Sequence, residues 1–482
     1  MYEPKPKKHY KLVIFLVALF LLLCGMLLFA IIYLQMTDRL SDILDIVREF
    51  LKTGGIFSIL LVFWVLIIPL LLVVLLIVNK YRRKKYRRVR DAWKEALRIV
   101  AEREAAERAA KEALEKQLPP PRFSQLNEMD ESRAPREKRQ GEHISSLQEL
   151  CTKFRNFAAG RLGLFYSPTD IREFISSLAV SHIIILQGMS GTGKTSLAYA
   201  FGEFLGNPSV IIPVQPMWKE RTDLLGYYNE FTKKFNETLL LEKMYEANKR
   251  KDIYIAVLDE LNIARVEYYF AEFLSLLEIP DAESRYLDVV PDVWENDPQG
   301  LKHGRIKLPE NMWFIGTANN DDSTFAISDK VYDRAMVLEL DRKAEEFVLS
   351  EEEAAQKPVS FTAEEFGSLI EREQAWFEIT TRNERRLRVL DEYLIDKFQI
   401  TFGNRIMKQI RNYISVYVSC GGEEMDALDD ILCKKVFRKF EALNAAYVRS
   451  EADALCSFMN GLFGEGRMAR CLAYIHRIAR NG

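Results

Sequence analysis

"GMSGTGKT", residues 188–195, is the most informative stretch of this 482-residue chain. It matches the pattern G-x-x-x-x-G-K-[ST], and it stands between an apolar run, "HIIILQ" (182–187), and a helical pattern, "SLAYAFGEFL" (196–205). In that context the pattern predicts a P-loop, where glycines let backbone N–H groups turn toward phosphate oxygens at a helix N-terminus. The predicted phosphate-binding residues are consecutive: Gly188, Met189, Ser190, Gly191, Thr192, Gly193, Lys194, Thr195 and Ser196.

A pair of carboxylates completes the pattern of a nucleotide hydrolase. Lys194 is expected to bind the outer phosphates, and the Thr195 hydroxyl is expected to ligate Mg²⁺. Sixty-five residues after Lys194, the apolar run "IYIAVLD" (253–259) ends in Asp259, and Glu260 follows. Asp259 is suited to hold the Mg²⁺ shell, and Glu260 to orient and deprotonate the attacking water. We therefore predict hydrolysis of ATP or GTP with Mg²⁺.

Five short apolar runs separated by helical stretches predict an α/β fold. Such alternation is typical of a parallel sheet covered by helices on both faces. After Asp341 the chain reads mostly as helix, which predicts a C-terminal helical lid. The five predicted strands are residues 182–187, 209–215, 253–259, 312–318 and 335–340.

The N-terminal part contains two uncharged apolar runs, residues 12–34 and 56–78. About 20 apolar residues span a bilayer core, so both runs are expected to be transmembrane helices that form a hairpin. Basic residues before the first run and after the second predict both termini in the cytoplasm, with the chain in the inner (cell) membrane. Apolar residues at helical spacing between the runs predict a short helix on the outer surface.

Residues 80–118 lack Pro and Gly and predict a basic helical stalk. Its cluster from Lys80 to Arg90 is expected to face anionic lipid, with nucleic acid as the alternative. Residues 119–143 begin with three prolines and are mostly polar, so we expect a flexible linker. The six cysteines and five histidines have no C-x-x-C or H-E-x-x-H spacing, and no structural zinc site is predicted.

The soluble part resembles AAA+ ATPases of the branch typified by the McrB restriction GTPase. The resemblance rests on four stretches: "LQGMSGTGKTSLA" (186–198), "VQPMWKERTDLLGYYN" (214–229), "LDELNIARVEYYFAEFLSLLE" (258–278) and "FIGTANNDDSTFAISDKVYDRA" (314–335). It implies an AAA+ core at 144–341, with a parallel five-stranded sheet, and a helical lid at 342–482. It also implies a ring, usually a hexamer, with nucleotide between neighbouring subunits.

Three further site residues are carried over from this resemblance. Asn319 would be the polar sensor that hydrogen-bonds the γ-phosphate or the lytic water. Arg334 would be the finger that reaches the neighbouring subunit's γ-phosphate, although a lone arginine before a strand is otherwise a surface charge. Arg405, on a lid helix, would be a second sensor for phosphate or merely a helix-end residue. Ala318 and Ser323 depart from the family pattern, so ATP is favoured and GTP stays open.

Two functions of different classes remain. The first is a membrane-anchored AAA+ motor in a McrB-like restriction or phage-defence complex, with a separately encoded effector such as a nuclease. The second is an inner-membrane scaffold that remodels or assembles proteins under nucleotide control and does not act on DNA. No nuclease or DNA-reading motif in this chain decides between them.

Overall fold

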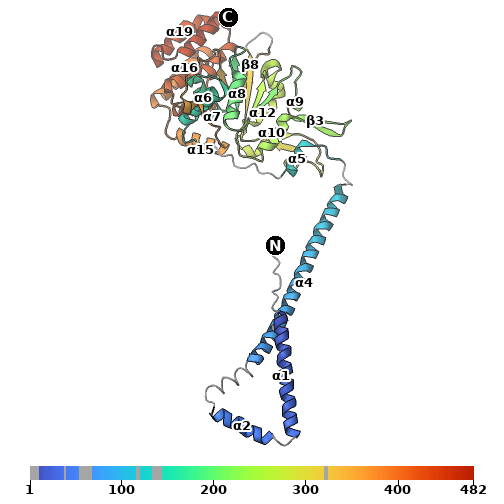
Figure 1. The fold of residues 1–482 in the computed structure, drawn as a ribbon. Coiled ribbons are helices and arrows are strands. Elements are labelled where there is room, and N and C mark those ends of the chain that lie inside the picture. The colour runs from blue at the N-terminus through green and yellow to red at the C-terminus, as the bar shows by residue number, and fades with distance from the viewer. Residues whose placement is uncertain are drawn as a thin grey trace. The chain divides into compact units, whose positions relative to one another are not determined.

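The computed structural model describes residues 10–36, 40–53, 68–115, 120–132, 144–319 and 324–481 (Figure 1). The chain divides into two compact units, Met1–Leu118 and Pro119–Gly482. In the first unit the described residues form three helices: α1 (Tyr10–Met36), α2 (Leu40–Thr53) and α4 (Ile68–Glu115). Helix α2 lies where a helix was predicted between the apolar runs, and residues 80–115 of the predicted stalk are helical within α4.

The helices of this unit contradict the predicted membrane hairpin and the predicted location in the inner membrane. A bilayer crossing needs about 20 apolar residues in one helix. Within the described ranges, no helix combines the length and the apolar character that such a crossing needs. Much of the second predicted span, residues 56–67, lies outside those ranges. The lipid contact predicted for Lys80 to Arg90 stays a prediction.

A five-stranded parallel sheet in the order β2-β5-β8-β1-β9 forms the centre of the second unit, as predicted. Ile184 and Leu186 of β1 belong to one hydrophobic core, and Ile183 and Ile185 to the other. This alternation follows from the two-residue period of a strand, and it explains why all the strands are apolar runs. The strands are β1 (Ile183–Gly188), β2 (Val210–Pro213), β5 (Tyr254–Asp259), β8 (Met312–Asn319) and β9 (Met336–Glu339).

Helices cover both faces of this sheet. One core contains α6 (Leu147–Leu162), α7 (Pro168–Val180), α8 (Lys194–Phe204) and most of the C-terminal helices. The other contains α10 (Leu239–Ala247), α11 (Val266–Tyr269) and α12 (Ala271–Leu276). Shorter elements join them: α9 (Thr222–Leu225), the hairpins β3 (Gly226–Asn229)–β4 (Lys234–Glu237) and β6 (Tyr286–Asp288)–β7 (Arg305–Lys307), η2 (Leu261–Ile263), η3 (Ala282–Ser284) and α13 (Asp329–Tyr332).

The chain after Asp341 is helical, which confirms the predicted C-terminal helical region. Its elements are α14 (Glu351–Ala354), α15 (Ala363–Gln374), α16 (Thr381–Phe398), α17 (Asn404–Ser419), α18 (Glu424–Lys435), η4 (Phe437–Ala442), α19 (Ala445–Phe463) and α20 (Ala469–Asn481). These helices share a hydrophobic core with one face of the sheet. The boundary at 341/342 stays a prediction, because Pro119–Gly482 is one compact unit.

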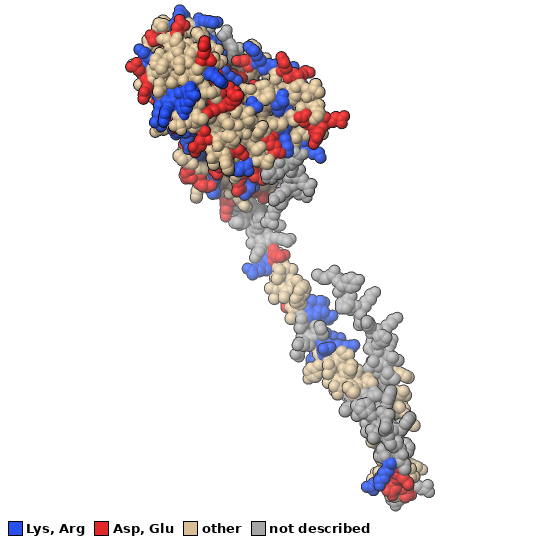
Figure 2. Space-filling view, turned by 90° about the vertical axis from the view of Figure 1, so that its left-hand side faces the viewer, with Lys and Arg blue, Asp and Glu red and all other residues tan. Residues whose placement is uncertain are grey.

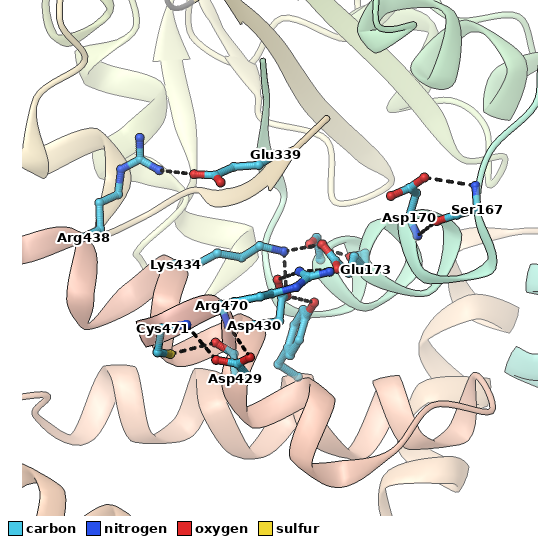
Figure 3. Close-up of polar contacts among 12 residues, drawn as sticks. Ser167, Asp170, Glu173, Glu339, Asp429, Asp430, Lys434, Arg438, Arg470 and Cys471 are labelled. Atoms are coloured by element: carbon cyan, nitrogen blue, oxygen red, sulfur yellow. Dashed lines mark hydrogen bonds and ion pairs between the residues drawn. The ribbon is translucent and has the colours of Figure 1, made fainter. Parts of the chain in front are cut away.

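A buried charge cluster also joins this helical region to α7 (Figure 3). Lys434 Nζ lies 2.8 Å from Glu173 Oε2 and 2.6 Å from Asp430 Oδ2, and Arg470 Nη1 lies 2.6 Å from each of the same two carboxylates. Burial lowers the pKa of Lys434, but the two carboxylates outweigh this and raise it, so the ammonium stays charged. Two cations therefore balance two carboxylates.

Part of the predicted flexible linker is ordered. Arg122 is 3% exposed and pairs with Asp297 through Nε–Oδ1 and Nη2–Oδ2 contacts of 2.8 and 2.6 Å. Phe123 stacks on Phe235 of β4 with ring centroids 4.8 Å apart, and helix α5 (Gln125–Glu131) follows. Buried apolar and ion-pair contacts thus fix this segment, and the prediction of flexibility is wrong for it. Residues 133–143 lie outside the described part of the chain.

Candidate nucleotide-binding site

The P-loop connects β1 to α8, as its sequence predicted, and its glycines have the backbone geometry that the loop requires. Gly188 and Gly193 have φ angles of 150° and 90°. A Cβ on Gly188 would lie 2.3 Å from the carbonyl oxygen of Leu340, so only glycine fits there. Lys194 is 7% exposed, and its Nζ donates to the carbonyl oxygens of Gly188 (3.0 Å) and Met189 (2.8 Å). The ammonium thus lies inside the loop that is expected to surround phosphates.

Thr195 and Asp259 meet where the carboxyl ends of the strands approach α8. Thr195 Oγ1 donates to Asp259 Oδ1 over 2.8 Å, and Thr317 Oγ1 donates to the same oxygen over 2.8 Å. Hydroxyl and carboxylate oxygens are the ligands that Mg²⁺ prefers, so this donor set fits the ion. Thr317 was not predicted as a site residue; finding it requires knowing that β8 is the neighbour of β5.

Glu260 adopts a backbone conformation that is uncommon for its residue type. Its φ and ψ are 53° and 47°, in the left-handed region. The Glu260 N–H donates to Thr317 Oγ1 over 2.9 Å, and the side chain is exposed to solvent. A left-handed non-glycine residue costs about 1–2 kcal/mol and persists where its surroundings impose it. Here the hydrogen bond to Thr317 holds the turn that carries the exposed Glu260 side chain, directly after Asp259.

Asn319 ends β8 directly beside the P-loop. It pairs with Gly188 in the parallel register, which brings its backbone to the first P-loop glycine. The chain beyond β8 is held by Asn262, a residue that sequence reasoning missed. Its Nδ2 donates to Asn319 O (3.0 Å), Thr324 Oγ1 (2.9 Å) and Phe325 O (3.3 Å). Residues 320–323, which include the neighbouring Asn320 and Ser323, lie outside the described residues.

Arg334 lies at the opposite, amino edge of the sheet. Its carbonyl oxygen accepts from Ser181 Oγ, two residues before β1, whereas the P-loop follows the last residue of β1. Ser181 and Gly188 are seven positions apart along extended chain, a distance of roughly 20 Å at ~3.3 Å per residue. The Arg334 side chain therefore cannot reach the P-loop of its own chain.

Arg405, predicted as a second phosphate sensor or a helix-end residue, lies beside Arg334 at the amino edge of the sheet. Both guanidinium groups contact Glu278: Arg334 Nη2 lies 2.9 Å from Oε2, and Arg405 Nη1 contacts Oε1. The position of Arg405 follows from the packing of α17 against α7, which places the start of α17 near the beginning of β1. It is not part of the P-loop site of its own chain.

The C-terminal helical region instead brings Arg438 near the P-loop. Arg438 Nη2 donates to Gln187 Oε1 over 2.7 Å, one residue before the loop, and the guanidinium stacks over Tyr332 at 3.7 Å. Figure 3 shows Arg438 directed toward Glu339 at the end of β9. A cavity of about 600 Å³ is lined by Glu339 and by Asp341, whose carboxylate lies beside Gly188. Nothing in the local sequence around Arg438 indicated this position.

The comparisons agree with this geometry. Residues 183–335 match the family model of the AAA domain of the dynein-related subfamily. This part of the chain is an AAA domain. AAA domains in general bind ATP and Mg²⁺, and the match implies ATP hydrolysis. The predicted α/β class with a P-loop core is confirmed at this level.

Individual relatives are more distant. The chain is 28% identical over 173 residues to the type IV methyl-directed restriction enzyme EcoKMcrB subunit of Escherichia coli (strain K12). The match covers 34% of this chain and 36% of that protein, so the chain spans about a third of that relative's length. A crystal structure of an ATPase candidate from Cytophaga hutchinsonii ATCC 33406 matches with a TM-score of 0.39 and 13% identity, over 65% of this chain and 93% of that one.

Proposed function

We propose that the AAA domain hydrolyses ATP with Mg²⁺ and uses the cycle to move neighbouring copies of the chain. The observation that carries the proposal is the convergence of Thr195 and Thr317 on one Asp259 oxygen, next to a P-loop with Lys194 inside it. Oxygen ligands, a buried ammonium and an adjacent exposed carboxylate are the groups that phosphoryl transfer to water requires.

Each residue has a distinct role in this proposal. Lys194 and the P-loop N–H groups bind the phosphates, and Thr195 and Asp259 hold Mg²⁺, which supplies charge neutralisation when bound. Glu260 orients a water and accepts its proton, and Thr317 fixes the turn that carries Glu260. Asn319, opposite Gly188, is proposed to hydrogen-bond the γ-phosphate or the attacking water.

A ring of identical subunits follows from the position of Arg334. Because it lies roughly 20 Å from its own P-loop along β1, a P-loop nucleotide that it contacts would be that of another copy. A head-to-tail contact of this kind closes into a ring if the rotation between copies permits, and a hexamer is our proposal. Arg334 would stabilise charge that develops on the neighbour's γ-phosphate.

We propose that this ATPase is the motor of a restriction or phage-defence complex, with a separately encoded effector such as a nuclease. The sequence similarity to the McrB subunit supports this role. The alternative is a protein-remodelling or assembly ATPase that does not touch DNA. It is favoured by the visible face of the Pro119–Gly482 unit in Figure 2, where basic and acidic side chains are interspersed. A protein that binds nucleic acid usually presents a basic stripe.

Turnover assays test the proposal. The full chain should release phosphate from ATP only with Mg²⁺, and release from GTP should be slower. Double-stranded DNA should raise the rate in a salt-sensitive manner if the chain serves a DNA-directed complex, and should leave it unchanged for the alternative. Absence of release from either nucleotide, with nucleotide binding intact, would contradict the proposed ATPase.

A further inference from the structure

Two arginines from separate elements share one carboxylate at the amino edge of the sheet. Glu278 follows α12, Arg334 precedes β9, and Arg405 opens α17. Arg334 contacts one Glu278 oxygen at 2.9 Å and Arg405 contacts the other, while Arg405 also lies 3.6 Å from Asp333. The side chains of Glu278 and Arg405 are 34% and 50% exposed, so solvent reaches this pair. Such partly exposed ion pairs are weak and are screened by salt.

The shared carboxylate borders a cavity of about 560 Å³. Besides Glu278, Arg334 and Arg405, its lining includes Lys408, Gln409 and Asn412 of α17. Three cationic side chains face this cavity against the one carboxylate of Glu278, so the lining carries an excess of positive charge. The side-chain amides of Gln409 and Asn412 also line the cavity, and their N–H groups can donate hydrogen bonds. The cavity therefore suits an anion with several oxygens.

The anion cannot be the chain's own nucleotide, because the P-loop lies at the other edge of the sheet. Planar guanidinium groups bind phosphate oxygens in pairs, so two of them in one pocket match the outer phosphates of a nucleotide. The occupant that fits this chemistry is a second copy of the chain with nucleotide in its P-loop.

We propose that Glu278 is a releasable counter-ion: it holds Arg334 and Arg405 together in the isolated subunit, and the phosphates of a neighbouring copy's nucleotide replace it on assembly. The inference rests on the proposed ring ATPase and adds to it a second arginine acting between copies and a carboxylate that competes with assembly. Glu278 is a positioning residue, because it touches the arginines and not the nucleotide. The competition makes assembly depend on nucleotide, since a copy without phosphates offers nothing to replace the carboxylate.

The test compares Glu278→Gln with wild type in the full chain, using sedimentation with a non-hydrolysable ATP analogue and Mg²⁺. Removing the carboxylate should lower the protein concentration for half-assembly about fivefold or more. Glu364→Gln is the matched control, because Glu364 forms an exposed pair with Lys251. The control should assemble as wild type does.

A second variant separates the two arginines and guards against misfolding. Arg405→Ala should raise the half-assembly concentration while leaving the affinity of the subunit for the ATP analogue unchanged, because Arg405 does not reach its own P-loop. If a folded Glu278→Gln protein assembles as wild type does, or more weakly, the inference is overturned. Glu278 would then serve only to hold α17 in place. Sedimentation detects assembly without any hydrolysis, so the two proposals can fail separately. A wild-type protein that assembles with nucleotide but does not hydrolyse it would contradict the proposed ATPase. The two variants would then still decide this inference.

Discussion

Thr195 Oγ1 and Asp259 Oδ1 lie 2.8 Å apart and are joined by a hydrogen bond between α8 and the end of β5. The two residues are 64 positions apart in the chain, and only the parallel packing of β5 and β1 on either side of β8 brings them to one place. Thr317, on the intervening β8, donates to the same carboxylate oxygen. The hydrolytic site is thus built from consecutive strands of the sheet rather than from one loop.

The role of Thr317 can be separated from its packing. Thr317→Val keeps the shape of the side chain but removes the hydroxyl that contacts both Asp259 and the Glu260 N–H, whereas Thr317→Ser keeps the hydroxyl. We expect ATP turnover to fall by about 10²-fold in the valine variant, since a preorganised polar contact is lost. The serine variant should retain most of the activity. Equal losses in both variants would indicate a packing role, and nucleotide affinity measured in parallel should change little in either.

Asn262 should affect both stability and turnover. Asn262→Leu removes the amide that donates to Asn319 O, Thr324 Oγ1 and Phe325 O, and we expect this loss of hydrogen bonds to cost about 1–3 kcal/mol. Urea denaturation should show this loss, and turnover should fall because the end of β8 loosens. Asn248→Leu is a control, since Asn248 bonds carbonyl oxygens far from the P-loop. A loss of stability in Asn262→Leu without any loss of turnover would remove Asn262 from the site.

The buried charge cluster of Figure 3 should contribute strongly to stability. Lys434→Met removes one of the two cations that pair with the carboxylates of Glu173 and Asp430, so we expect a loss of about 3–5 kcal/mol. Lys251→Met, at an exposed ion pair, should cost no more than about 1 kcal/mol. Equal free energies of unfolding for the two variants would show that the cluster is not charged as we describe it.

Lys435 should give stability a dependence on pH near neutrality. Its Nζ donates to the carbonyl oxygens of Tyr332 (3.0 Å) and Asp333 (3.2 Å) and also to that of Ala335, around Arg334. Burial lowers the pKa of Lys435 to about 7 from an ordinary value of 10.5. Below pH 7 the ammonium is charged in both states, and the folded protein bears the cost of burying it.

Between about pH 7 and 10.5 the folded protein therefore binds fewer protons than the unfolded chain, so this contribution stabilises the fold as pH rises. The free energy of unfolding of wild type minus that of Lys435→Met should thus increase from about pH 6 to pH 9. Subtracting the variant cancels the other titrating groups. A difference that stays constant over this range would mean that Lys435 keeps its ordinary pKa.

The sequence was informative where function depends on neighbours in the chain. The P-loop, the strand that ends in Asp259 and Glu260, and all five strands of the sheet follow from apolar runs and glycine spacing. Thr317 was missed because its role depends on strand order, and Asn262 because its acceptors are more than 50 residues away. The position of Arg405 beside Arg334 could not be predicted from the sequence, because the docking of α17 is a tertiary property. The segment around Arg122 was read as flexible because its composition does not reveal a buried partner such as Asp297.

Mixing two inactive variants tests most directly whether hydrolysis at one P-loop is completed by the next copy. Glu260→Gln lacks the proposed base, and Arg334→Ala lacks the arginine that reaches the neighbour, so neither alone should turn over ATP. In a ring assembled from equal amounts of both, an Arg334→Ala subunit keeps Glu260 and can receive Arg334 from a Glu260→Gln neighbour. We expect turnover to recover to about a quarter of the wild-type rate, since half of the subunits have the base and half of their neighbours supply the arginine. No recovery on mixing, with mixed assemblies formed, would contradict catalysis between copies.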